Sequence, residues 1–214
     1  MRVSLLALFV ASIAVLGAEV KPFKWSGELN VPDPTSVTFD EAGNAYVAST
    51  TRRKAGDLDI REHRLWIPDD VGLTSPAEKL AFFQRELAPG KMKIGRGSLK
   101  DHNKDGSVDW KDLTFHQERI YKLADTDRDG VADKITVFAE GFNSPVSGIA
   151  AGVLYFDGWV YLTAIPDVWR LKDTDGDGVA DVKEVIATGF GGHIAYAGHD
   201  MHGLRLGPDG RIYW

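Results

Sequence analysis

The sequence predicts an all-β fold, a β-propeller, from three observations: an internal repeat, two kinds of hairpin in each repeat, and a period near 50 residues. The repeat spans residues 120–141 and 168–189, and its copies are identical at twelve positions. Each copy reads as a strand, an acidic glycine turn and a second strand. A tighter hairpin is predicted at 156–161, with similar phrases at 39–47 and 208–213. Four strands in about 50 residues are typical of one propeller blade.

The blades are predicted to begin near Thr35, Ser147 and His202, which gives two blades and the start of a third. The propeller domain is assigned to residues 32–214. Because propellers close with four or more blades, we expect these residues to be an incomplete, N-terminal fragment of a longer propeller.

The first blade contains an insertion at residues 51–118, which we expect to be partly helical and functional because of its length. Ser75 and Glu78 form a capping box around Pro76, and apolar residues follow until Pro89. One short amphipathic helix is therefore predicted. The basic run at 52–54, upstream of it, is interpreted as a solvated surface turn.

The N-terminus and the composition predict an exported protein. Residues 1–18 have the layout of a cleaved signal peptide, and the apolar run within them is shorter than the roughly 20 residues that span a membrane. No membrane span is expected. The absence of cysteine suits an oxidising compartment, so we expect a periplasmic or secreted location. The net charge of −6 argues against nucleic-acid binding, which needs clustered Lys and Arg.

Three acidic loops have the spacing of calcium-binding loops, with oxygen ligands at positions 1, 3, 5, 9 and 12 and glycine at position 6. We name them the Asp101 loop (101–112), the Asp125 loop (125–136) and the Asp173 loop (173–184). Thr136 occupies position 12 of the Asp125 loop, so we expect the weakest Ca²⁺ binding there and the tightest in the Asp173 loop. The predicted ligands are Asp173, Asp175, Asp177, Asp181, Glu184, Asp101, Asn103, Asp105, Asp109, Asp112, Asp125, Asp127, Asp129 and Asp133. Acidic Asp-Gly turns are also ordinary hairpin ends, and we expect any bound ion to be structural.

Three histidines, His193, His199 and His202, stand within ten residues, just before the predicted inner hairpin of the third blade. Residues that enter an inner strand point toward the central channel of a propeller. The segment precedes Gly-Pro-Asp-Gly-Arg-Ile-Tyr at 207–213. It resembles the soluble quinoprotein glucose/sorbosone dehydrogenases, in which a catalytic His lies shortly before a Gly-Pro-Asp-x-x-Ile-Tyr strand. The acidic repeats and Gly-His-Asp-Met-His-Gly at 198–203 are more similar still to the N-terminal propeller of planctomycete and verrucomicrobial membrane-bound dehydrogenase-like proteins.

The resemblance implies oxidation of a sugar or related alcohol, with His199 as general base and pyrroloquinoline quinone (PQQ) as hydride acceptor. It further implies Ca²⁺ at the quinone, a cytochrome c as electron acceptor, and cofactor-holding Arg and Lys residues beyond Trp214. Asp200 is expected to orient His199 or to lie behind it.

Two alternatives stay open. One is a non-catalytic, calcium-stabilised propeller that binds carbohydrate or a protein partner. The other is a calcium-dependent hydrolase such as a lactonase, which would need Glu, Asn and Asp ligands in the channel.

Overall fold

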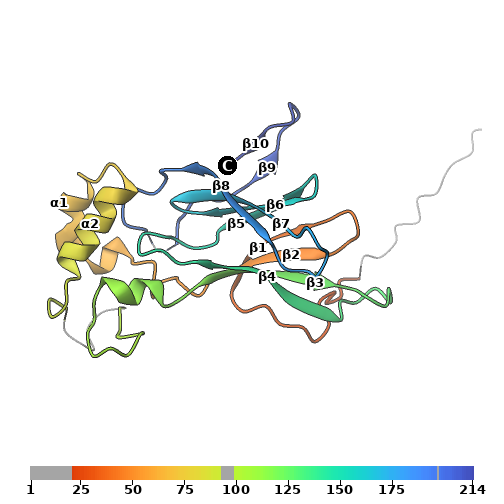
Figure 1. Ribbon diagram of the computed structural model, residues 1–214, viewed down its shortest axis with the longest axis horizontal. Helices are drawn as coiled ribbons and strands as arrows, with labels where there is room; N and C mark the ends of the chain where they lie inside the picture. The colour runs from red at the N-terminus through yellow and green to blue at the C-terminus, as the bar shows by residue number, and fades with distance from the viewer. Residues whose placement is uncertain (1–20, 93–98, 197) are drawn as a thin grey trace, which may run out of the picture.

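The structure is a computed structural model that describes residues 21–92, 99–196 and 198–214 of the chain. The predicted signal peptide, residues 1–18, lies outside the described residues. Two four-stranded antiparallel sheets, a short hairpin and a helical lobe make up the fold (Figure 1). None of the helices in the described part is long and apolar enough to cross a membrane.

Both sheets are built from consecutive antiparallel strands, in the orders β1-β2-β3-β4 and β5-β6-β7-β8. The first sheet comprises β1 (Pro34–Phe39), β2 (Ala45–Ser49), β3 (Glu118–Ala124) and β4 (Lys134–Phe142). The second comprises β5 (Gly152–Phe156), β6 (Trp159–Ala164), β7 (Asp167–Lys172) and β8 (Val182–Thr188). A separate hairpin joins β9 (Arg205–Leu206) to β10 (Ile212–Tyr213). The predicted predominance of antiparallel β-structure, with two hairpins in each repeat, is confirmed.

The second sheet packs on the first through apolar side chains of both. Val153 and Leu162 of the second sheet share a buried core with Tyr46 and Phe138 of the first. Hydroxyl groups join the two edges as well, since Thr38 Oγ1 accepts the Tyr155 N–H at 3.0 Å. The repeat therefore builds two like sheets that stack side by side.

The opposite face of the first sheet is covered in part by the segment that precedes β1. Trp25 packs there against Leu123 and Ala132. The Ala132 N–H donates to the Trp25 carbonyl at 2.8 Å, just as the Ala180 N–H of the second repeat donates to the Phe138 carbonyl at 2.8 Å. The segment at Trp25 thus occupies, relative to the first repeat, the place that β4 occupies relative to the second.

The insertion between β2 and β3 forms the helical lobe beside the sheets (Figure 1). The predicted helix is confirmed as α2 (Pro76–Glu86), whose N-cap Ser75 Oγ accepts the Glu78 N–H at 3.3 Å. A capping box predicts that the Glu78 side chain accepts the Ser75 N–H. It instead accepts the N–H of the preceding residue, Thr74, at 2.7 Å. Four further short elements of the insertion were not predicted: η1 (Ile60–Glu62), η2 (Arg64–Trp66), α1 (Ile67–Asp70) and η3 (Trp110–Thr114).

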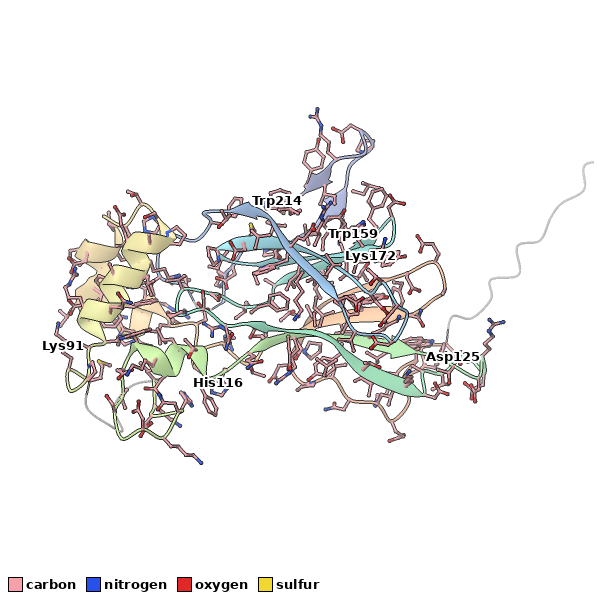
Figure 2. All side chains as sticks on the ribbon, in the orientation of Figure 1. Lys91, His116, Asp125, Trp159, Lys172 and Trp214 are labelled. Carbon is pink, nitrogen blue, oxygen red and sulfur yellow. The ribbon has the colours of Figure 1, made fainter. Side chains whose placement is uncertain are left out.

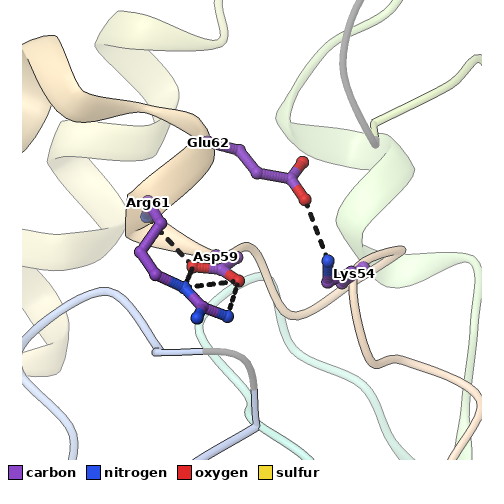
Figure 3. A network of polar contacts seen from close by, with 4 residues as sticks. All are labelled: Lys54, Asp59, Arg61 and Glu62. Carbon is purple, nitrogen blue, oxygen red and sulfur yellow. Dashed lines mark hydrogen bonds and ion pairs between the residues drawn. The ribbon is translucent and has the colours of Figure 1, made fainter.

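The interpretation of residues 52–54 as a solvated turn is wrong for Arg52, which is fully buried. Its guanidinium donates to five backbone carbonyls, those of Gly56, Leu113, His116, Ser144 and Ser147. Lys54 is exposed as expected and pairs with Glu62 at 3.2 Å, beside the ion pair of Arg61 and Asp59 (Figure 3). Arg52 therefore ties the insertion to the connection between the two sheets, because carbonyls from both regions accept from one buried cation.

Candidate functional site

A cleft of about 650 Å³ is lined mainly by the segment that follows β8, together with Trp214. His193, His199 and His202 all line this cleft, together with Asp200 and apolar residues that include Ile165 and Trp214. The structure thus brings the three predicted histidines to one space. Gly191 lets this segment pass close to Ile165. It has a φ of +66°, and a Cβ there would lie 2.5 Å from the Ile165 side chain.

The insertion supports this segment through Asp70, the last residue of α1. Asp70 is buried, and its Oδ1 accepts the Ile194 N–H at 2.7 Å. The Asp70 carbonyl oxygen lies 2.7 Å from His193 Nδ1. A carbonyl oxygen only accepts, so Nδ1 is the donor.

Two further contacts extend the support along the segment. The Ile60 N–H of η1 donates to the Ala195 carbonyl at 3.0 Å. The Arg61 guanidinium lies over the Tyr196 ring, 4.4 Å from its centroid, which is a cation–π contact. One wall of the cleft is therefore held by the inserted lobe and not by the sheets.

His199 and Asp200 lie further along the same segment and differ in burial. Asp200 is buried, and its Oδ2 accepts the Ile149 N–H at 2.7 Å. Burial raises the pKa of Asp200, against the opposing effects of that hydrogen bond and of nearby Lys79. The His199 ring is exposed, and within the described residues it makes no hydrogen bond.

A cluster of buried charges lies behind this segment. Its members are Arg52, Asp57, Lys79, Glu118 and Asp200. The Glu118 carboxylate is well satisfied, since it accepts from Thr50 Oγ1 and from the N–H groups of Thr51, Arg52 and Ala150. Asp57 Oδ2 is buried and has no hydrogen-bond partner in the described part of the chain.

Burial dominates the electrostatics of this cluster. It raises the pKa of Asp57 to about 8, and the negative charge of Asp200 adds to that increase. It also lowers the pKa of Lys79, whose Nζ lies 3.4 Å from the Gly191 carbonyl. No sequence pattern pointed to Asp57, Asp70 or Lys79, because their partners are remote in the chain.

The three acidic loops share one backbone design. In each, the position 6 glycine donates its N–H to the position 1 carboxylate, at 3.0 Å in the Asp101 loop, 2.9 Å in the Asp125 loop and 2.8 Å in the Asp173 loop. Those glycines have φ values of +89°, +95° and +95°, which an L side chain rarely adopts. Each position 5 carboxylate likewise accepts the position 7 N–H.

Two of these loops gather the carboxylates of positions 1, 3 and 5. The oxygens of Asp125, Asp127 and Asp129 lie within 4.8 Å of one another, as do those of Asp173, Asp175 and Asp177. Such hard oxygen donors suit Ca²⁺, which takes six to eight of them. Both loops lie at the end of the sheets remote from the helical lobe, as Asp125 shows against Lys91 and His116 (Figure 2).

The predicted ligands at positions 9 and 12 make other contacts. Asp133 and Asp181 each accept from a threonine hydroxyl at position 2, at 2.7 and 2.8 Å. Glu184 lies on β8 and pairs with Arg170 across the strands. The structure therefore brings neither Asp181 nor Glu184 into the carboxylate cluster of the Asp173 loop.

In the Asp101 loop, positions 9 and 12 begin a 3₁₀ helix. Asp109 caps η3 by accepting the Lys111 N–H at 2.8 Å. Asp112 accepts the N–H groups of His102 and Asn103 through Oδ1. Both carboxylates are buried and stabilise the loop backbone.

Comparison with known proteins identifies a family. The model of a family described as a domain of unknown function (DUF7133) matches residues 23–214, so the chain belongs to that family. No curated protein and no solved structure matches the chain.

Proposed function

We propose that this DUF7133 protein is an exported dehydrogenase of the β-propeller type that oxidises a sugar or related alcohol in the histidine-lined cleft. The observation that carries the proposal is the meeting of His193, His199, His202 and Asp200 in one cleft of about 650 Å³. That volume lies in the range of small-molecule sites, and apolar walls with a few convergent polar groups are typical of them.

The propeller assignment is supported by repetition. Two sheets of the same strand order stack side by side, and the β9–β10 hairpin follows them as β5–β6 follows the first sheet. In a propeller, the segments that enter the innermost strands surround the central channel. The cleft lies on such a segment, directly before β9.

The proposed chemistry begins with proton removal by His199. Its exposed imidazole, in the neutral form, accepts the proton of a substrate hydroxyl. The neighbouring Asp200, when ionised, attracts the imidazolium that results. Loss of that proton favours transfer of hydride from the carbon that carries the oxygen to a two-electron acceptor, which an artificial dye supplies in the test below.

The described residues do not fit PQQ as the hydride acceptor. That cofactor carries three carboxylates, and the residues that line the cleft include no Lys or Arg. Cationic side chains are the usual partners of carboxylates in such sites. We therefore assign no PQQ-binding residue, and a cytochrome c stays the proposed final electron acceptor.

The test is oxidation of sugars and alcohols by the purified protein. Reduction of an artificial electron-accepting dye, with and without added PQQ and Ca²⁺, is measured for the natural protein and for His199→Ala. We expect turnover that His199→Ala lowers at least a hundredfold, within the usual contribution of a general base. His63→Ala is the matched control, because His63 lies in the insertion stacked on Trp66. Absence of turnover under every condition would contradict the dehydrogenase.

The described part of the cleft lining contains no Lys or Arg, which favours a second candidate, a non-catalytic propeller that binds carbohydrate. It predicts measurable sugar binding by calorimetry, no oxidation, and no response to PQQ. Dye reduction therefore separates the two candidates, because only the dehydrogenase would show it.

We further propose that the Asp125 and Asp173 loops bind Ca²⁺ in a structural role. The support is the proximity of three carboxylates in each loop, since like charges so close repel one another unless a cation or protons intervene. The Asp101 loop has Asn103 in place of a carboxylate at position 3, so it carries less of this repulsion. It is therefore the weakest of the three candidates, whereas the sequence alone led us to expect the weakest binding in the Asp125 loop.

A further inference from the structure

A main-chain carbonyl favours one neutral tautomer of one of the cleft histidines. His193 Nδ1 donates to the Asp70 carbonyl at 2.7 Å. Neutral imidazole carries one N–H, so when Nδ1 holds the proton, Nε2 holds a lone pair and accepts. Within the described residues Nε2 has no hydrogen-bond partner, and the ring is 60% exposed at the cleft.

The position of the ring is restrained as well as its proton. Asp70 holds the adjacent main chain through its carboxylate, which accepts the Ile194 N–H at 2.7 Å. Ile194 is buried in the core of the insertion. On the other side, Gly192 lies against the backbone of Ser75, where an added Cβ would come within 3.2 Å. His193 is therefore fixed on both sides by the inserted lobe.

His199 and His202 contrast with His193. Both line the same cleft and are exposed, and neither ring makes a hydrogen bond within the described part of the chain. A ring without such a bond exchanges its proton between the two nitrogens and rotates. It suits proton transfer, whereas a ring with one fixed nitrogen suits recognition.

We propose that His193 is a specificity-determining residue, whose Nε2 accepts a hydrogen bond from a substrate hydroxyl other than the one His199 deprotonates, and that Asp70 is its positioning residue. This inference rests on the proposed sugar or alcohol substrate. It narrows the ligand class to compounds with two or more hydroxyl groups, because one hydroxyl meets His199 and another meets His193.

The first test needs no substrate. Long-range ¹H–¹⁵N correlation spectra of the ¹⁵N-labelled protein report which ring nitrogen carries the proton. They are recorded at a pH high enough for the histidines to be neutral. His193→Gln identifies the His193 signals by their loss. We expect His193 as the Nδ1–H tautomer, while unrestrained histidines favour Nε2–H. An Nε2–H signal for His193 would overturn the inference.

Asp70 variants test the positioning role in the same spectra. Asp70→Asn keeps an oxygen for the Ile194 N–H and the main-chain carbonyl, so the His193 tautomer should be unchanged. Asp70→Ala frees the Ile194 N–H, and we expect mixed His193 tautomers. An unchanged pure Nδ1–H signal in folded Asp70→Ala would remove Asp70 side-chain positioning from the proposal.

The second test measures recognition by calorimetry. D-Glucose, D-galactose, D-mannose and sorbitol are titrated, and the tightest ligand is compared with its monodeoxy derivatives. In the natural protein we expect one deoxy position to weaken binding about fivefold through loss of the hydroxyl bonded to His193. In His193→Phe that penalty should vanish, whereas in His193→Gln, whose amide oxygen can accept, part of it should persist.

The outcomes separate this inference from the proposed function. Binding with the deoxy pattern but without oxidation would uphold the role of His193 and contradict the dehydrogenase. Oxidation with equal deoxy penalties in the natural protein and His193→Phe would support the dehydrogenase and contradict the role of His193. Failure of all four ligands to bind would overturn the inference.

Discussion

The acidic loops and the histidine cleft are assembled in opposite ways. In the Asp173 loop, Gly178 donates to Asp173 five residues away, and Thr174 donates to Asp181 seven residues away. In the cleft, Ile194 donates to Asp70, 124 residues away. A short loop constrains itself through its own spacing, whereas the cleft exists only when the inserted lobe docks on the sheets.

The largest effect should come from cutting the link between lobe and sheets. Arg52→Ala removes one buried cation and leaves five carbonyls without their donor, so we expect a loss of about 3–5 kcal/mol in the free energy of unfolding. Chemical denaturation measures it. The control is Lys54→Ala, two residues on, which removes an exposed ion pair and should cost less than about 1 kcal/mol. Equal losses in the free energy of unfolding for the two variants would contradict the contrast between buried and exposed charges.

A pH-dependent effect should follow from Asp57, behind the cleft. Its pKa is raised to about 8 from 3.8, so the folded state binds its proton more tightly than the unfolded state. Stability from this group is therefore complete below about pH 4 and is lost as the pH rises toward 8. Asp57→Asn should remove that decline, so its stability relative to the natural protein should rise between pH 5 and pH 8. Thermal denaturation across this range would contradict the assignment if both proteins followed parallel curves.

Ca²⁺ binding tests the acidic loops separately from the cleft. At 100 times its dissociation constant, a Ca²⁺ ion bound only by the folded state adds about 2.7 kcal/mol of stability per site. We expect added Ca²⁺ to raise the melting temperature, and Asp173→Asn to remove one site's share. The cleft should not respond, so the His193 tautomer should be the same with and without Ca²⁺. A Ca²⁺-induced change of that tautomer would show that the two regions are coupled.

The smallest effect concerns position 12 of the Asp173 loop. Glu184 pairs with Arg170 across β7 and β8 and stands apart from the carboxylate cluster. Glu184→Gln should therefore leave Ca²⁺ affinity within about twofold and cost at most about 1 kcal/mol, the usual worth of a surface ion pair. A large loss of affinity by calorimetry would instead restore Glu184 as a ligand.

Local features of the fold were predictable from sequence. The hairpins followed from alternation and from Asp-Gly turns, and α2 followed from Ser75, Pro76 and Glu78. The acidic loops were recognisable because their hydrogen bonds join residues at most ten positions apart. Arg52 was misread, since a basic run looks the same whether its guanidinium meets water or five carbonyls.

The sequence by itself determined the repeat, the strands and the spacing of the acidic side chains, because each depends on neighbours along the chain. Only the tertiary structure decided which charges are buried, that Asp70 supports the histidine segment, and that Glu184 turns to Arg170. Those outcomes depend on which surfaces meet when the lobe and the sheets pack, and desolvation at such a contact depends on residues far apart in sequence.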